Sequence, residues 1–195
     1  MVERINGRIL GWGLNWALIK TIASRKIINL VTNTPSAVKI KLNTMIDGWQ
    51  HLRPENGYAV AKVGRTTGWT TGKINTIGSI VRIRDNYFLV VPVEFKREER
   101  KFDDVALVFG ILADDGIVAF IAPGDSGSVV LHNEEEGMAL GLGFAGNSAT
   151  FLSYMMPMGH VIRDIESITG AKVVNFPNRG TLEGKDLAKH RILER

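Results

Sequence analysis

Ala-Pro-Gly-Asp-Ser-Gly-Ser-Val-Val, residues 122–130, combines a glycine-rich turn with the start of an apolar strand. Gly124 and Gly127 carry no Cβ, so the backbone can turn until the N–H groups of Gly124 and Ser126 converge beside the Ser126 hydroxyl. The following Ser-Val-Val-Leu, residues 128–131, is typical of a buried strand, which would hold such a turn rigidly. An ordinary polar β-turn is the alternative interpretation, because Pro-Gly-Asp-Ser-Gly is common turn chemistry.

Three further segments accompany this turn in a fixed chain order. Before it, residues 60–74 read Val-Ala-Lys-Val-Gly-Arg-Thr-Thr-Gly-Trp-Thr-Thr-Gly-Lys-Ile. After it, residues 138–146 end in Gly-Leu-Gly-Phe-Ala-Gly, and residues 154–170 carry apolar side chains at Pro157, Val161, Ile162, Ile165 and Ile168. Residues 138–144 are typical of a strand, and a helix is expected at residues 158–169, ended by Gly170.

These segments resemble the chymotrypsin and trypsin-like serine peptidases, most closely the divergent fungal ones, with residues 60–74 similar to the opening hairpin of the C-terminal barrel. With the segment at residues 14–19, the resemblance covers roughly residues 9–170. The resemblance implies an all-β fold with a C-terminal helix, built as a chymotrypsin-like antiparallel β-barrel. It implies that Ser126 is the nucleophile and that the amides of Gly124 and Ser126 form the oxyanion hole. Asp125 would order the loop before the nucleophile, through a partner that the sequence does not reveal.

The same resemblance implies a primary specificity pocket without charge. Phe120 stands at its floor, six residues before the serine, and Phe144, Ala145 and Gly146 form its wall. A preference for Lys or Arg is therefore not expected. The wall backbone would pair with an extended peptide or protein substrate.

The catalytic triad is incomplete. Leu-Asn-Trp-Ala-Leu-Ile, residues 14–19, resembles the strand that carries the catalytic aspartate, but Asn15 occupies the aspartate position. An amide there can hold the wrong imidazole tautomer, a change that costs about 10⁴-fold in turnover in a related enzyme. The family histidine would precede Asn15 by tens of residues, and none of the 14 residues before Asn15 is a histidine.

Four histidines lie elsewhere in the chain. His132 is placed about 20 Å along a strand from Ser126, beyond hydrogen-bond reach. His160 and His190 are expected at the surface. His51, in the expected interdomain connection, is the one candidate for a substitute base, and a solvated loop residue is the alternative.

Composition favours a soluble globular chain without a cofactor. The 195 residues are 45% hydrophobic and include no cysteine, which favours a reducing, cytoplasmic compartment or a family branch that never used disulfides. The net charge of +4 is spread over loops of mixed sign, so we expect no nucleic-acid partner. The acidic pairs 103–104 and 114–115 lack His or Cys at ligand spacing, and no metal site is expected. We expect no membrane segment, and Asn15 argues against a signal peptide in residues 1–20.

The expected organisation has four parts. Residues 1–46 form a remnant of an N-terminal barrel, 47–57 an interdomain connection, 58–176 the C-terminal barrel with its closing helix, and 177–195 a polar tail. An incomplete N-terminal barrel would expose an apolar face near Trp12, Trp16 and Trp49, through which the chain would self-associate. The strands expected in the barrel are Tyr58–Val63, Thr71–Ile77, Ser79–Arg84, Tyr87–Val93, Val105–Leu112, Ile117–Ile121, Ser128–Leu131 and Met138–Phe144, with a helix at Met158–Thr169.

Two hypotheses of function remain at the level of sequence. The first is a serine endopeptidase that is truncated or inactive as given, because it lacks its histidine. The second is a pseudopeptidase that keeps the groove as a peptide-binding module. An enzyme with a base from outside the family pattern is a third, minor alternative.

Overall fold

The computed structural model describes most of the chain between residues 31 and 173 and two short segments before it. The described residues are 2–5, 8–12, 31, 33–42, 44, 46, 48–53, 57–84, 87–91, 105–116, 118–134, 138–147 and 150–173. The predictions for Asn15, Trp16, His190 and the tail 177–195 lie outside these residues.

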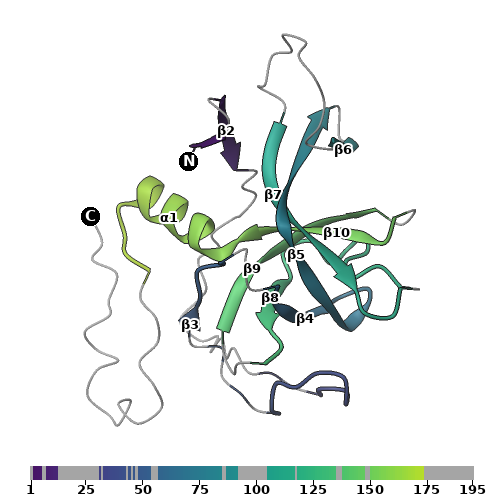
Figure 1. The fold of residues 1–195 in the computed structure, drawn as a ribbon. Coiled ribbons are helices and arrows are strands. Elements are labelled where there is room, and N and C mark those ends of the chain that lie inside the picture. The colour runs from purple at the N-terminus through teal and green to yellow at the C-terminus, as the bar shows by residue number, and fades with distance from the viewer. Residues whose placement is uncertain are drawn as a thin grey trace, which may run out of the picture.

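Ten strands and one helix make up the described part (Figure 1). In chain order they are β1 Val2–Ile5, β2 Arg8–Trp12, β3 Gly48–Trp49, β4 Ala59–Gly64, β5 Gly68–Arg84, β6 Tyr87–Val91, β7 Val105–Ala113, β8 Val129–His132, β9 Met138–Asn147, β10 Leu152–Pro157 and α1 Met158–Thr169.

Six of these strands close into an antiparallel barrel. The order around the barrel is β4, β5, β7, β10, β9, β8 and back to β4, and each neighbouring pair is antiparallel. Registers such as Ile74 opposite Ile111 and Val60 opposite His132 close the ring. The expected all-β fold with a closed antiparallel barrel and a C-terminal helix is confirmed.

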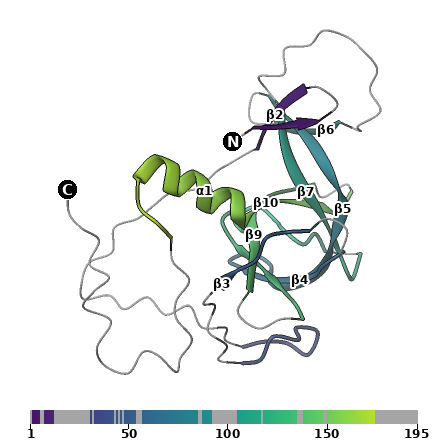
Figure 2. The ribbon, with the colours of Figure 1, turned by 60° about the vertical axis from the view of Figure 1, so that its left-hand side comes forward.

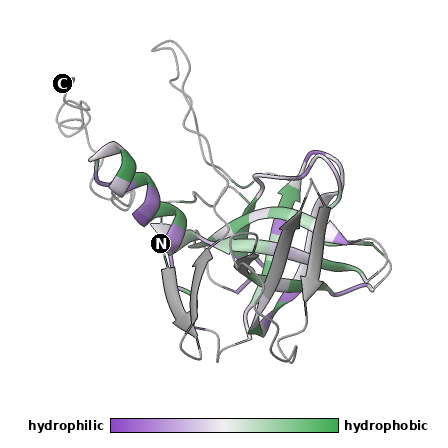
Figure 3. Ribbon diagram, turned by 90° about the horizontal axis from the view of Figure 1, so that it is seen from above, coloured by the Kyte–Doolittle hydropathy of each residue, from purple (hydrophilic) through white to green (hydrophobic). Residues whose placement is uncertain are grey.

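The barrel interior is an apolar core that alternation along the strands produces. On β7, Ile111 is fully buried whereas its neighbour Leu112 is 52% exposed, because successive strand residues point to opposite faces. Figure 3 shows the apolar positions recurring along the barrel strands. The buried core residues are Tyr58, Val60, Ile74, Phe109, Ile111, Phe120, Ile121, Val130, Leu140 and Met155.

A second apolar cluster lies outside the barrel, between α1 and the segment that precedes β3. Val31, Val38 and Ile40 pack there with Val161 of α1 and Leu131 of β8. Asn133 fixes the segment, because its side chain accepts a hydrogen bond from Lys39 N and donates one to Ala37 O. The described residues between 31 and 46 thus lie against the C-terminal barrel, and their assignment to an N-terminal barrel remains a prediction.

The hairpin of β1 and β2 belongs to the same sheet, which it joins through β7. β1 and β2 pair antiparallel, and β2 adds to β7 in parallel with Gly11 opposite Ala106. Trp49, expected on a self-association face, is half-buried and packs in the second cluster, with its ring edge-on to His51. Self-association stays a prediction.

Most expected elements of the barrel have the predicted type. The helix spans Met158–Thr169 as expected and ends at Gly170, whose φ of 67° is the left-handed cap conformation. The strands expected on either side of Gly78 are instead one long strand, β5, with an irregularity between Ile74 and Gly78. Figure 2 shows α1 projecting from the end of β10, beside the barrel. No helix in the described ranges has the length and apolarity that crossing a bilayer requires.

The prediction of a strand at Ile117–Ile121 is wrong. Its described residues 118–121 form bends and coil. Side chains there take the place of a strand neighbour: the Thr70 hydroxyl donates to Phe120 O, and Ile121 N donates to Ser153 Oγ. Phe120 and Ile121 fill the barrel core although they do not lie on a strand, and the apolar pattern alone does not distinguish a buried coil from a buried strand.

The alternation on β7 generates a stability prediction. We expect Ile111→Ala to lower the free energy of unfolding by about 2–5 kcal/mol, because it opens a cavity in the core. Leu112→Ala, the matched exposed control, should change it by less than about 1 kcal/mol. Urea denaturation followed by tryptophan fluorescence measures both, and equal losses would contradict the barrel register.

Candidate functional site

The turn at residues 122–128 is held by its own backbone and by β9. Gly124 and Gly127 have φ values of 99° and 88°, a region that favours glycine. Within the turn, Asp125 N donates to Ala122 O at 3.0 Å. Gly127 N donates to Gly143 O at 2.8 Å, which fixes the turn to the barrel wall.

Ser126 stands at the exposed tip of this turn. The amides of Gly124 and Ser126 donate to no acceptor among the described residues, whereas those of Asp125, Gly127 and Ser128 all do. The Ser126 hydroxyl likewise makes no hydrogen bond within the described part of the chain. The turn therefore carries a hydroxyl and two backbone donors that no described group uses.

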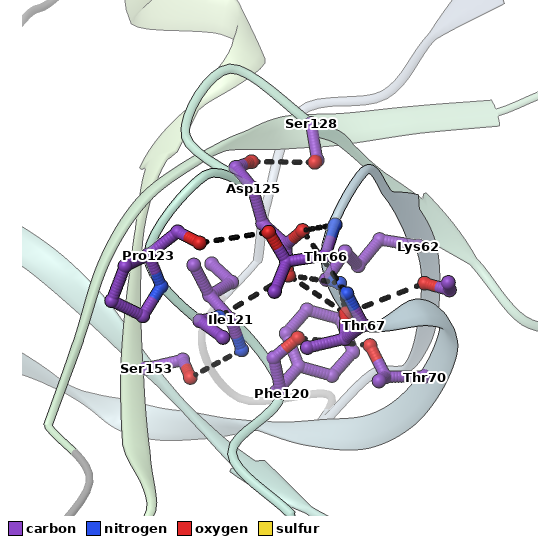
Figure 4. Close-up of polar contacts among 12 residues, drawn as sticks. Lys62, Thr66, Thr67, Thr70, Phe120, Ile121, Pro123, Asp125, Ser128 and Ser153 are labelled. Atoms are coloured by element: carbon purple, nitrogen blue, oxygen red, sulfur yellow. Dashed lines mark hydrogen bonds and ion pairs between the residues drawn. The ribbon is translucent and has the colours of Figure 1, made fainter.

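Asp125 points the opposite way, into the barrel, where it is 1% exposed. Its Oδ1 accepts from Thr66 N at 2.7 Å and from Thr67 N at 3.3 Å. Its Oδ2 accepts from the Thr67 hydroxyl at 2.7 Å, from Lys62 Nζ at 3.0 Å and from Ala122 N at 3.2 Å (Figure 4). Four of these five donors belong to the β4–β5 hairpin and tie the turn to it.

Lys62 is the partner of Asp125 that the sequence did not reveal. Its side chain is fully buried on β4, and Nζ contacts Asp125 and the Thr67 hydroxyl. Nζ also lies 5.7 Å from the centre of the Phe120 ring, within cation–π range. The sequence signal that could have found it is strand alternation. Lys62 follows the buried Val60 by two residues on the same strand, so its side chain points to the same, inward face. A buried ammonium needs a counterion.

The electrostatics of this pair favour an ionised carboxylate. Burial raises the pKa of Asp125, but hydrogen bonds from Thr67, Thr66, Lys62 and Ala122 outweigh it and hold that pKa well below its ordinary value. Burial lowers the pKa of Lys62, and the hydrogen bond and charge of Asp125 oppose this effect. Gly64 leaves room for the carboxylate, because a Cβ there would lie 2.3 Å from Asp125 Oδ1.

The residues predicted for the specificity pocket differ in burial. Phe120 is fully buried in the barrel core, Phe144 and Ala145 are half-buried, and Gly146 is exposed. A Cβ on Gly146 would lie 2.3 Å from Ile121 O, so the segment at Ile121 touches the β9 backbone there. A substrate side chain has no room between these two segments at that point, and the pocket assignment remains a prediction.

The described histidines lie away from Ser126. At Ala139, β9 pairs with Trp49 of β3 on one side and with Leu131 of β8 on the other. The Ser126 turn lies on the β8 side, whereas the ring of His51 contacts Gly159 at the start of α1. His51 is therefore across β9 from the turn, which argues against its role as a base.

The other two described histidines are buried or half-buried structural residues. His132 is 8% exposed and packs edge-on against Tyr58. Burial, together with the charges of Arg163 and His51, lowers the pKa of His160 to about 4. Among the described residues, no group of three His, Cys, Asp or Glu side chains is placed to hold a metal ion.

Comparisons with known proteins identify solved structures only. No protein-family model matches the sequence, and no curated protein is significantly similar to it. The similar solved structures are chymotrypsin-like serine proteases. A chymotrypsin of Cellulomonas bogoriensis is 18% identical with a TM-score of 0.49, over 80% of this chain and 67% of that one.

Two more structures are similar at the same level. Protease A of Thermobifida fusca is 18% identical with a TM-score of 0.49, over 79% of this chain and 64% of that one, so the chain spans less than two thirds of its length. A glutamic-acid-specific serine protease, described as using a histidine triad in substrate binding, is 17% identical with a TM-score of 0.46, over 86% of this chain and 75% of that one.

The buried pair generates an asymmetric stability prediction. Asp125→Asn leaves the Lys62 ammonium buried without a counterion, and we expect it to cost about 3–5 kcal/mol in the free energy of unfolding. Lys62→Met should cost clearly less, because Asp125 keeps four hydrogen-bond donors. Lys39→Met is the matched control: its ion pair with Glu134 is exposed and should contribute less than about 1 kcal/mol. Denaturant unfolding measures all three, and a larger loss for Lys62→Met than for Asp125→Asn would overturn this account.

The lowered pKa of Asp125 leads to a second prediction, which concerns stability at low pH. In the unfolded chain an aspartate takes up its proton near pH 4, whereas in the folded protein Asp125 stays ionised at that pH. Its contribution to stability is therefore complete above about pH 5 and declines as the pH falls below about 4. We expect the ¹³C resonance of its carboxyl group to stay at the ionised position down to pH 3. A titration step near pH 4 would refute the buried hydrogen-bond network as described.

Proposed function

We propose that this chain carries the nucleophile-bearing barrel of a serine endopeptidase, with Ser126 as the nucleophile. The observation that supports the proposal is the Ser126 turn itself. Asp125 is anchored inward by five donors, and two left-handed glycines flank the exposed serine. The Gly124 and Ser126 amides have no described acceptor, as an oxyanion hole requires.

By itself the described part of the chain supplies no base to Ser126. A serine hydroxyl without an imidazole keeps its high pKa, and an oxyanion hole with binding leaves only about 10³ to 10⁴-fold acceleration over water. We therefore propose that peptide hydrolysis by this chain is too slow for ordinary assays. If a histidine were supplied from elsewhere, Asn15 at the aspartate position would make it a poorer base, because an amide can hold the wrong imidazole tautomer.

The second candidate function is a pseudopeptidase that binds peptides without cleaving them. The contact between Ile121 and Gly146 favours it, because the predicted pocket has no room for a side chain there. Binding would then rely on backbone pairing along β9. A peptide or protein is the proposed partner under both candidates.

Chemical rescue tests the role of Ser126. A fluorophosphonate probe reacts with an activated serine hydroxyl, and free imidazole in the buffer can serve as the missing base. We expect no stoichiometric labelling within minutes without imidazole and a labelling rate that rises with imidazole concentration. Ser126→Ala should abolish this rise, and Ser36→Ala, at another exposed serine, should not alter it.

Two outcomes would each overturn one part of the proposal. Rapid, Ser126-dependent labelling without imidazole would support Ser126 as the nucleophile and overturn the proposed lack of a base. A folded chain whose labelling ignores imidazole, or is equal in Ser126→Ala, would exclude Ser126 as a positioned nucleophile and leave the binding module.

A further inference from the structure

Arg65 is an exposed cation beside the Ser126 turn. It belongs to the β4–β5 connection, three residues after Lys62 and directly before Thr66. A Cβ on Gly124 would lie 3.0 Å from Arg65 Nη2 and 3.6 Å from Arg65 Nε, so the guanidinium covers this side of the glycine. Thr66 holds the connection in place, because its hydroxyl donates to Pro123 O at 2.8 Å.

The charge of Arg65 is not used by the described residues. The two ion pairs described in the chain join Lys39 to Glu134 and Lys62 to Asp125. The carboxylate of the turn itself, Asp125, points inward and forms an ion pair with Lys62. A positive charge therefore lies beside an exposed turn with two backbone amides that have no described acceptor, a combination that suits an anion.

The direction of the strands selects the kind of anion. β8 pairs with β9 at Val129–Leu131, opposite Leu142 to Ala139. The Ser126 turn directly precedes β8, so it lies at the Leu142 end of this pairing. β9 continues to Asn147, and on its β8 side no described strand pairs with Ala145 or Gly146. A peptide that adds antiparallel to this part of β9 runs from Asn147 towards Gly143. Its carboxyl end then arrives at the turn.

We infer that Arg65 and the amides of Gly124 and Ser126 bind the C-terminal carboxylate of an extended peptide. The inference deepens the proposed function, since it rests on the same turn and names its ligand class. A free carboxylate suits the site chemically: it accepts two backbone N–H bonds and one guanidinium without any proton transfer, so the absent base has no effect on binding.

Binding of matched peptides tests the inference on the intact chain. The probes are acetyl-Ala-Ala-Ala-Leu with a free carboxylate and the same peptide with a C-terminal amide, titrated while ¹H–¹⁵N spectra report the backbone amides. We expect the acid to shift the resonances of Gly124 and Ser126 and to bind at least about tenfold more tightly than the amide. Arg65→Gln should remove most of this preference. Lys73→Gln, which removes another exposed cation from the same hairpin, should preserve it.

The outcomes separate this inference from the proposed function. Equal affinities for acid and amide, in a chain whose Ser126 still labels with imidazole, overturn the carboxylate site alone. A preference for the acid that survives Arg65→Gln, or shifts confined to residues other than the turn, also overturns it. If the chain binds the peptide acid more tightly than the amide but its Ser126 does not label, the carboxylate site is supported and the proposal of Ser126 as nucleophile is overturned. Acetate that binds as tightly as the tetrapeptide acid would overturn the part played by β9.

Discussion

The hydrogen bonds to the buried carboxylate of Asp125 are the constraint on which the site depends. They join three parts of the chain that are distant in sequence: β4 through Lys62, the β4–β5 connection through Thr66 and Thr67, and the turn through Ala122. Because the carboxylate is drawn inward, the next residue, Ser126, is turned outward. The geometry of the exposed serine is thus set by the satisfaction of a buried charge, and the same contacts place Arg65 beside Gly124.

A barrel interior is an unusual place for an ion pair, since each charge loses its hydration there. Here the cost falls unequally on the two groups. The carboxylate has five donors and keeps a lowered pKa, whereas the ammonium has few partners and its own pKa is lowered by burial. Lys62 is better explained as a device that fixes the turn in one conformation than as a source of stability, because an apolar pair of similar volume would avoid the desolvation of both groups.

Sequence patterns predicted the architecture well where one physical cause dominates. The helix Met158–Thr169 follows from its apolar spacing and from the glycine that ends it, and β4, β7, β8 and β9 follow from apolar runs between turns. The prediction of a strand at Ile117–Ile121 was wrong because Phe120 and Ile121 are buried as part of a coil, whose backbone hydrogen-bonds to the Thr70 and Ser153 side chains. Strand β10 was not predicted, and part of it was assigned to the helix region at residues 154–170. Leu152–Pro157 is buried at nearly every position and therefore shows no alternation. In the candidate site, the turn chemistry predicted the need for Gly124 and Gly127, whose φ values are positive, whereas the roles of Ser126 and of the two amides stay predictions. The pairing with Lys62 joins residues 63 positions apart, which a local pattern does not predict.

The long span of the Lys62–Asp125 contact bears on how the chain acquires its fold. β4 and β5 form a local hairpin, but the barrel closes only when β10 pairs with both β7 and β9, late in the sequence. Contacts of such high sequence separation form slowly, because the entropy of closing the loop is lost before the contacts are gained. During synthesis, therefore, a chain that ends before β10 lacks the closed barrel in which Lys62 and Asp125 are buried. The exposed serine turn is expected to reach its final geometry only in the last, cooperative step of folding.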